Sequence, residues 1–219
     1  MATAARKFAG VESQNPHKPC LSVEVVATRL DLAPGAVEEL ADCLRDDERQ
    51  RAGRFRLARD RRRYIVAHGR LRQLLAARLG TVPRSVELSC TAHGKPRLAP
   101  GSSVVDLRFN VSHSRDLALF AFCRGREVGI DVEAVHAVQD ADTIAAWYFP
   151  PRELAAFLSL APSDKALGFF AGWTRTEALG KALGDGLRRS PARSDAAGWR
   201  LHGFCPEPGY VAALAVERT

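Results

Sequence analysis

The segment Val128-Gly129-Ile130-Asp131-Val132-Glu133 predicts a buried strand, because apolar and β-branched residues surround its two acidic ones. Side chains two positions apart on a strand share a face, so Asp131 and Glu133 are expected to project together. Two carboxylates on one side of a buried strand repel each other unless a cation lies between them. If Glu177 joins the pair at one metal ion, then without that ion the mutual repulsion of the three carboxylates should raise at least one of their pKa values. The pair therefore marks a candidate metal site.

A second segment, Trp173-Thr174-Arg175-Thr176-Glu177-Ala178-Leu179-Gly180-Lys181, carries further polar groups on a predicted helix. Its Trp173, Glu177 and Lys181 recur every four residues and so form one stripe. Three carboxylates and a lysine from the two segments can make a Mg²⁺ site with a phosphate partner, which favours metal-assisted phosphoryl chemistry. An ordinary structural interpretation is also open for each segment, namely a solvated acidic pair at a strand end and an exposed helical ion pair.

The composition is that of a globular protein with one large domain or two small ones: 219 residues, 46% hydrophobic and 26% charged. No apolar run of about 18 residues occurs, so no membrane span is expected. No apolar core follows Met1–Lys7, which argues against a secretory signal. The five cysteines form no Cys-x-x-Cys pair, so neither a disulfide framework nor a zinc site is supported. We expect a cytoplasmic protein.

The net charge of +7 and the isoelectric point near 9.5 suggest an anionic partner. Of the 32 Lys and Arg residues, 12 lie between Arg45 and Arg78, and arginine grips phosphate with a planar fork of donors. A nucleic-acid surface would add stacking aromatic residues, and this stretch has only Phe55 and Tyr64. A small anionic ligand or an acidic protein therefore fits better than nucleic acid, although most of these arginines suit a solvated helix face.

The hydrophobic pattern predicts an α+β fold. Strands are expected at 21–30, 85–90, 104–111, 116–123, 127–133, 198–204 and 210–217. Helices are expected at 35–44, 46–54, 59–79, 141–149, 151–160 and 164–183, with glycine stops at Gly80 and Gly184. Residues 1–18 are expected to form a loose arm. The similar segments 114–122 and 208–216 suggest two similar α/β lobes, 1–124 and 125–219, with the acidic strand at their junction, unless the similarity is chance.

Two predicted loops add groups that can bind phosphate. Asn110-Val111-Ser112-His113-Ser114 supplies hydroxyls, an amide and an imidazole, and Gly94-Lys95-Pro96 holds a lysine next to a rigid proline. Both loops also suit ordinary turn-forming roles. The chain has no Gly-x-x-x-x-Gly-Lys-[Ser/Thr] segment, which argues against a nucleoside triphosphatase, and no Gly-x-Ser-x-Gly elbow, which weakens a hydrolase assignment.

Taken in order, four motifs resemble those of the 4′-phosphopantetheinyl transferases: Gly94-Lys95-Pro96, Phe109–Ser114, Gly129–Glu133 and Trp173-Thr174-x-x-Glu177-Ala178-x-x-Lys181. The chain length and the tryptophan-bearing last motif resemble the larger, monomeric Sfp-type enzymes. The resemblance runs from about residue 45 to residue 187. It implies transfer of 4′-phosphopantetheine from coenzyme A to a serine of an apo acyl or peptidyl carrier protein, with release of adenosine 3′,5′-bisphosphate. It also implies two lobes related by a pseudo-twofold axis, with the active site at their interface.

The resemblance further implies roles for individual residues. Asp131, Glu133 and Glu177 would hold Mg²⁺ against the coenzyme A pyrophosphate. Glu177 or a metal-bound water would take the proton from the carrier serine, and Lys181 would contact a phosphate. The nucleotide and pyrophosphate would be bound by Lys95, Pro96, Ser112 and His113, and the 3′-phosphate and adenine by Arg51 and Arg63.

One position departs from the family pattern. The last motif usually has the form Trp-[Ser/Thr]-x-Lys-Glu, and Thr176 stands where the lysine is expected. This departure puts a charge contact from that position in doubt, but the metal site is unaffected, so Thr176→Lys is expected to be tolerated. Two alternatives stay open: a non-enzymatic basic module that uses residues 45–78 to hold nucleic acid or an acidic protein, and a degenerate family member that binds a carrier without transfer.

Overall fold

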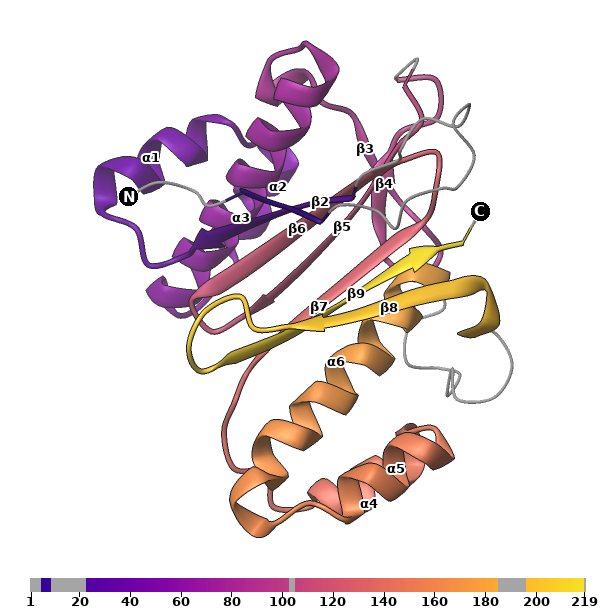
Figure 1. Cartoon of the computed structure of the whole chain (residues 1–219). Helices are drawn as coiled ribbons and strands as arrows, with labels where there is room; N and C mark the ends of the chain where they lie inside the picture. Colours follow the sequence, from indigo (N-terminus) through magenta and orange to yellow (C-terminus); the bar gives the residue numbers. More distant parts are fainter. Residues whose placement is uncertain (1–4, 9–22, 103–104, 185–195, 219) are drawn as a thin grey trace.

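Two antiparallel sheets form the centre of the molecule (Figure 1). The computed structural model describes residues 5–8, 23–102, 105–184 and 196–218. Its strands are β1 (Ala5–Phe8), β2 (Val23–Arg29), β3 (Leu88–Cys90), β4 (Pro96–Leu98), β5 (Leu107–Ser114), β6 (Leu117–Arg124), β7 (Val128–Ala134), β8 (Trp199–Phe204) and β9 (Tyr210–Glu217). The larger sheet has the order β1-β2-β6-β5 and the smaller one the order β7-β9-β8, and β3 pairs with β4 in a separate hairpin.

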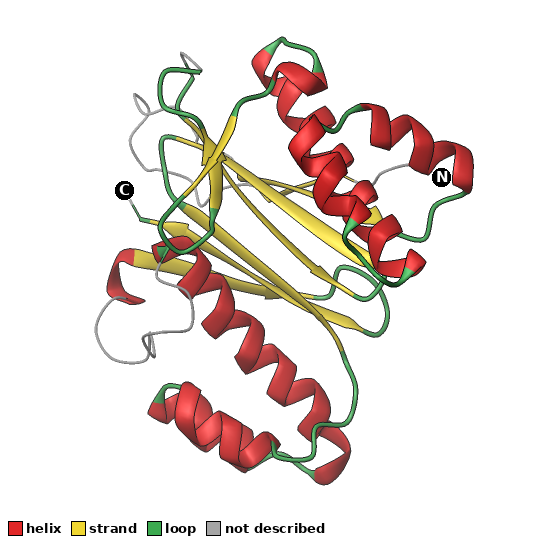
Figure 2. Ribbon diagram, turned by 180° about the vertical axis from the view of Figure 1, so that it is seen from behind, coloured by secondary structure: helices red, strands yellow, loops and turns green. Residues whose placement is uncertain are grey.

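The helices lie on the outer sides of the two sheets (Figure 2). They are α1 (Pro34–Asp42), α2 (Asp46–Gly53), α3 (Ala58–Leu79), α4 (Ala141–Tyr148), α5 (Pro151–Leu158) and α6 (Lys165–Leu183), with short 3₁₀ turns at Pro83–Ser85, Pro162–Asp164 and Ala196–Gly198. The predicted stops of α3 and α6 are confirmed, because Gly80 and Gly184 adopt left-handed φ angles of 65° and 79°. Among the described helices none is long and apolar enough to cross a membrane.

The larger sheet is covered on both faces, which explains why β6 is apolar almost throughout. The even-numbered residues from Ala118 to Phe122 pack in one core with α1 and α3. The odd-numbered residues from Leu117 to Cys123 pack in a second core against β7 and β9 of the smaller sheet. A strand buried on both faces needs apolar residues at consecutive positions. The fold is thus α+β, as predicted, with the two sheets between outer helices.

Three details of the sequence prediction are wrong. Within the segment expected to be a loose arm, Ala5–Phe8 forms β1, which pairs with the free edge of β2; the rest of 1–18 lies outside the described residues. Pro96, expected in a loop, is the first residue of β4. Asn110–Ser114 is not a turn but the second half of β5, paired with β6 along its length.

Candidate active site

Strand β7 and helix α6 face each other at the candidate site. The apolar residues Val128, Ile130 and Val132 point from β7 into the core between the sheets. Strand alternation therefore turns Gly129, Asp131 and Glu133 to the other face, as predicted. That face lies against α6: a Cβ atom built on Gly129 would be only 2.1 Å from the carbonyl oxygen of Ala178. Glycine at this position lets the helix approach the strand backbone closely.

Asp131 is the central buried group of the site, with 3% of its surface exposed. Its Oδ1 atom accepts a hydrogen bond from Nζ of Lys181 at 2.6 Å and another from Oγ of Ser112 at 2.8 Å. Lys181 also donates to the Ser112 hydroxyl at 3.0 Å. The structure therefore brings together an acidic residue of β7, a lysine of α6 and a serine of β5, three residues that the sequence assigns to one site.

The two glutamates lie in the same electrostatic environment. Burial raises the pKa of Glu133, the hydrogen bond from Ser114 at 2.7 Å opposes the rise, and the charge of Asp131 adds to it. Burial also raises the pKa of Glu177, helped by the negative charges of Asp131 and Glu133 and opposed by Lys181. The pKa values of Glu133 and Glu177 are thus raised, as expected, but burial contributes more to the rise than repulsion between the carboxylates does. Glu177 has no hydrogen-bond or ion-pair partner among the described residues, which leaves its carboxylate available to a ligand.

A row of side chains on β5 holds the edge of β7 in place. The amide hydrogens of Ile130, Val132 and Ala134 are accepted by side-chain oxygens of β5, at 2.8, 3.3 and 3.1 Å. The accepting residues alternate along β5 and are Asn110, Ser112 and Ser114. These side chains take the place of a neighbouring strand's carbonyl groups. Ser112 and Ser114 also hold the carboxylates of Asp131 and Glu133, so each serine fixes both the backbone and the acid.

The family resemblance implies no individual role for Asn110 or Ser114, although both belong to a segment that the sequence predicts to offer phosphate-binding groups. Their alternation with Val111 and His113 is the signal that indicates a strand, whereas the abundance of polar residues favours a turn. On a strand the same spacing of two places Asn110, Ser112 and Ser114 on one face.

His113 and Arg63 lie on the side of β5 away from β7. Loss of hydration lowers the pKa of the His113 imidazole, and the positive charges of Lys181 and Arg63 lower it further. Nε and Nη2 of Arg63 donate to Oδ1 of Asp116 at 2.9 and 2.7 Å. Arg51 is exposed and has no ion pair with any described residue. His113 thus lies within electrostatic reach of both Lys181 and Arg63, whereas the exposed Arg51 is available to a ligand.

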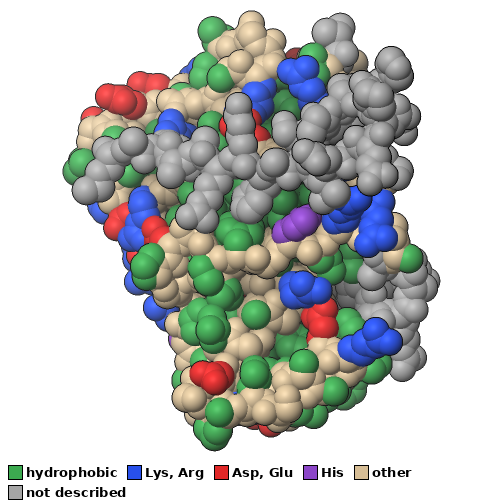
Figure 3. Space-filling view, viewed as in Figure 1, with side chains coloured by type: hydrophobic (Ala, Val, Ile, Leu, Met, Phe, Trp, Pro, Cys, Tyr) green, Lys and Arg blue, Asp and Glu red, His purple; other side chains and the backbone are tan. Residues whose placement is uncertain are grey.

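Several arginines of the basic segment are neutralised inside the protein. Arg72 is buried and pairs with Glu48, and Arg78 pairs with Glu24 at 2.6 Å. Figure 3 shows one face of the molecule, and at its left edge Asp and Glu side chains lie beside Lys and Arg side chains. This pairing weakens an interpretation of the segment as a nucleic-acid surface.

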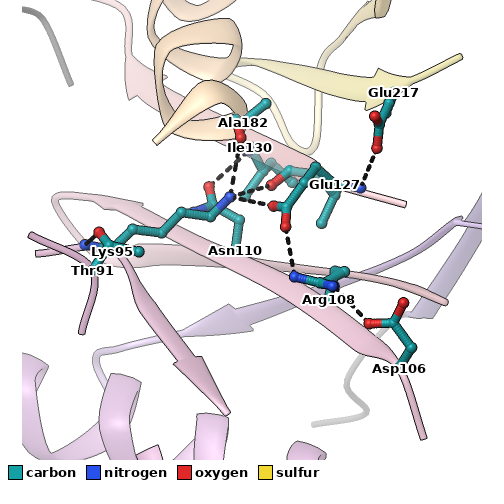
Figure 4. A network of polar contacts seen from close by, with 10 residues as sticks. Thr91, Lys95, Asp106, Arg108, Asn110, Glu127, Ile130, Ala182 and Glu217 are labelled. Carbon is teal, nitrogen blue, oxygen red and sulfur yellow. Dashed lines mark hydrogen bonds and ion pairs between the residues drawn. The ribbon is translucent and has the colours of Figure 1, made fainter. Parts of the chain in front are cut away.

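Lys95 and Pro96 lie at the other end of β7 from Glu133. The Lys95 ammonium contacts Glu127 and Val128 at the start of β7, not Asp131 (Figure 4). Both residues line a cavity of about 450 Å³ beside β4 and β5. Asp131 and Lys181 are not among the residues that line it. The structure therefore separates the Gly-Lys-Pro hairpin from the acidic group.

The carboxylates present fit a cation in part. No three His, Cys, Asp or Glu side chains of the described ranges converge closely enough to hold a metal ion. However, Oδ2 of Asp131 is buried and finds no hydrogen-bond partner in the described part of the chain. A buried carboxylate oxygen and two glutamates with raised pKa values are groups that a positive charge would stabilise, and their oxygen atoms suit Mg²⁺.

Trp173 and Thr176 anchor α6 rather than reaching the site. The Trp173 ring stacks on Phe169 at 6.0 Å between centroids and packs edge-on against Tyr148. Thr176 is 6% exposed, and its hydroxyl donates to the carbonyl oxygen of Gly172 at 3.1 Å. A lysine at this position would have to leave a buried environment, so the structure gives no support to the expected tolerance of Thr176→Lys.

Comparisons with known proteins agree on one family. A model described as the N-terminal domain of 4′-phosphopantetheinyl transferase matches residues 34–124, and one described as the 4′-phosphopantetheinyl transferase superfamily matches residues 127–205. The 4′-phosphopantetheinyl transferase HetI of Nostoc sp. is 36% identical over 215 residues, which cover 92% of this chain and 91% of HetI. The human L-aminoadipate-semialdehyde dehydrogenase-phosphopantetheinyl transferase is 30% identical over 152 residues, which cover 66% of this chain and 49% of the human protein.

Proposed function

The chain belongs to the 4′-phosphopantetheinyl transferase superfamily as an enzyme of the larger Sfp-type class, and we propose that it modifies carrier proteins. In the proposed reaction a serine of an apo acyl or peptidyl carrier protein attacks the β-phosphorus of coenzyme A. A new phosphate ester forms on the serine, the pyrophosphate bond breaks, and adenosine 3′,5′-bisphosphate leaves. A basic module without enzymatic activity has no use for the buried Asp131, and the comparisons give that alternative no support.

The observation that carries this proposal is the environment of Asp131. One oxygen of its carboxylate is held by Lys181 and Ser112, and the other is buried without a partner in the described chain. Asp131, Glu133 and Glu177 would hold Mg²⁺ here. When bound, the ion supplies positive charge for the pyrophosphate of coenzyme A. The hydrogen bonds from Ser112 and Ser114 would keep the first two carboxylates oriented.

The chain's own residues supply the remaining chemistry. Glu177 would accept the proton of the carrier serine, because its raised pKa makes it a stronger base than an exposed glutamate. Lys181 would place its positive charge beside a phosphate oxygen and stabilise the charge that develops as the bond breaks. The nucleotide end of coenzyme A would meet four further groups of the chain: Arg51, Arg63, Pro96 and His113.

The proposal includes the arrangement of two lobes, 1–124 and 125–219, about a pseudo-twofold axis. The strand orders support it: β2-β6-β5 and β7-β9-β8 both place the last strand of the three between the other two. In each case helices follow the first strand and precede the other two in the chain. A cytoplasmic location and a monomeric state belong to the same proposal.

The direct test is to incubate the protein with coenzyme A, Mg²⁺ and several apo carrier proteins and to weigh the carriers. We expect a mass increase of one phosphopantetheine on at least one carrier. The increase should disappear when the acceptor serine is changed to alanine or when a chelator removes the metal. A protein that modifies no carrier, with or without added Mg²⁺, would refute the proposed function.

A further inference from the structure

The side chain of Lys95 joins three separate parts of the protein (Figure 4). Its Nζ atom lies 2.9 Å from Oε2 of Glu127 and 3.3 Å from the carbonyl oxygens of both Val128 and Ala182. An ammonium group has three N–H donors, so each of them has an acceptor. Only 13% of the side chain is exposed. The β3–β4 hairpin, the start of β7 and the last turn of α6 therefore meet at one charge.

Both ends of this connection are fixed by further contacts. The backbone of Lys95 is held within its hairpin by Thr91, through a hydrogen bond from the Lys95 amide to Oγ1 at 3.1 Å and one from the Thr91 amide to the Lys95 carbonyl at 2.9 Å. Glu127 accepts a second ion pair from Arg108 at 2.9 Å, and its amide donates to Oε2 of Glu217 at 3.1 Å. Lys95 thus connects a backbone held by Thr91 to a glutamate, Glu127, that is itself held by Arg108 and Glu217.

The contact with Ala182 matters most for the site. The last four carbonyl groups of a helix lack partners within it, and the helix dipole makes that end negative. Ala182 is the penultimate residue of α6, and Lys95 supplies both a donor and a positive charge to its carbonyl. The preceding residue, Lys181, holds Asp131. The position of the Lys181 backbone is therefore tied to Lys95.

We propose that the Lys95 ammonium group is a positioning element of the enzyme and not a ligand of the coenzyme A phosphates. It fixes the last turn of α6, and with it Lys181, against the start of β7. To bind a phosphate, the ammonium would have to release at least one of its three acceptors. Two of these are carbonyl oxygens, and the one on Ala182, a residue that is 3% exposed, would then need another donor at the helix end. The effect of Lys95 on catalysis rests on the proposed function. Its role in holding α6 against β7 does not.

The test uses the full chain and three variants of this connection. Lys95→Met removes the charge and keeps the length of the side chain, Lys95→Arg keeps the charge, and Glu127→Gln removes the main acceptor charge. Arg97→Met is the matched control, because it removes one positive charge from the same hairpin, and among the described residues the Arg97 side chain bonds only to Ser89. Amide hydrogen exchange, the dissociation constant of coenzyme A and the turnover number are measured for each.

We expect Lys95→Met and Glu127→Gln to speed exchange in the last turn of α6, and Lys95→Arg and Arg97→Met to leave it unchanged. In Lys95→Met the turnover number should fall by about tenfold to a hundredfold, because displaced groups lose their alignment with the reacting atoms. The dissociation constant of coenzyme A should change by less than about threefold, since no direct contact is lost.

The opposite pattern would overturn the inference. If Lys95 binds a phosphate, Lys95→Met should weaken coenzyme A binding by about tenfold or more without changing exchange in α6. Glu127→Gln should then strengthen binding, because it frees the lysine. Should Lys95→Met not fold, unchanged exchange in Glu127→Gln would still refute the connection. A wild-type protein that binds no coenzyme A would refute the proposed function alone, since the exchange result needs no substrate.

Discussion

The Nζ atom of Lys181 lies 2.6 Å from Oδ1 of Asp131, across the interface between α6 and β7. The carboxylate is 4% exposed and the lysine 29%, so a buried acid is paired with a base that still reaches solvent. One carboxylate oxygen is fully used by this pair and by Ser112, and the other has no partner in the described residues. The charge of Asp131 is therefore balanced by Lys181 through one oxygen, while the other oxygen has no protein donor among the described residues.

We expect Asp131→Asn to reduce transfer by about a thousandfold, because it removes a metal ligand and part of the charge that orients Lys181. The amide still offers an acceptor to Ser112, so the free energy of unfolding should fall only by about 1–3 kcal/mol. Transfer is measured by carrier mass and stability by urea unfolding. Near-wild-type transfer would exclude Asp131 from the reaction, and complete unfolding would show that the ion pair is purely structural.

Glu177→Gln should abolish transfer and yet stabilise the protein in the absence of divalent metal. The folded state raises the pKa of Glu177 above its ordinary value of 4.5, so the folded protein binds more protons than the unfolded chain above that pH. Stability is then lost as the pH rises through this window, and the penalty is complete above the raised pKa. Glutamine removes the penalty, so the gain in melting temperature should be present at pH 7 and absent at about pH 4.

Added Mg²⁺ gives this variant an independent control. It should raise the melting temperature of the wild type, whose three carboxylates repel one another, more than that of Glu177→Gln. Equal shifts in the two proteins would place the metal away from Glu177. A variant less stable than the wild type at pH 7 would show that the carboxylate has a stabilising partner.

Gly129→Ala should separate α6 from β7. The added methyl group would lie 2.1 Å from the carbonyl oxygen of Ala178 and 2.5 Å from the amide nitrogen of Ala182, and helix backbone cannot move aside locally. We expect a loss of about 2–4 kcal/mol in the free energy of unfolding together with loss of transfer. Gly203→Ala is the control from the same sheet, because its methyl group would meet only Ala212 at 4.0 Å. Equal stability of the two variants would contradict the close approach.

The acidic pair and the fold class could be predicted because both depend on local alternation. The pattern of Val128–Glu133 fixes which side chains share a face, and β7 has that arrangement. The glycine stops of α3 and α6 were likewise predictable, since a left-handed residue ends a helix whatever surrounds it.

The hydrogen-bond acceptors of the Lys95 ammonium group were not predictable, because they come from distant segments of the chain. Glu127 is 32 residues from Lys95 and Ala182 is 87, and no local pattern joins them. Asn110–Ser114 has the composition of a turn, but pairing with β6 makes it a strand. Tertiary pairing overrides local preference in such segments.

Thr176→Lys should destabilise the protein rather than restore a missing function. The side chain is 6% exposed and its hydroxyl is bonded within α6, so an ammonium group would lose hydration or displace the helix. We expect a loss of about 2–4 kcal/mol in the free energy of unfolding. Thr176→Val keeps the shape and removes one hydrogen bond, and should lose no more than about 1 kcal/mol. A lysine variant with wild-type stability and higher turnover would show that the position does communicate with the site.

Charge reversal at Arg51 and Arg63 should have different effects on stability but the same effect on coenzyme A. Arg51 is exposed without an ion pair in the described chain, so Arg51→Glu should raise the KM for coenzyme A and change stability by less than about 0.5 kcal/mol. Arg63 pairs with Asp116 at 2.7 Å and is 21% exposed. Arg63→Glu should raise KM and also lose about 1–2 kcal/mol, because it places a third carboxylate beside Asp116 and Asp60.

The dependence of KM on salt concentration, together with a control variant of equal net charge, distinguishes a local charge effect of Arg51 from an effect of the protein's net charge. Exposed charges are screened over about 8 Å at physiological salt, so the KM difference between wild type and Arg51→Glu should shrink as salt is added. Arg152→Glu on α5 changes the net charge equally and should leave KM unchanged, because Arg152 is exposed and α5 lies at the opposite end of the molecule from α2 and α3 (Figure 1). An equal rise in KM for Arg152→Glu would attribute the effect to net charge. Tight, salt-resistant binding of duplex DNA by the wild type would instead show that the arginines serve nucleic acid.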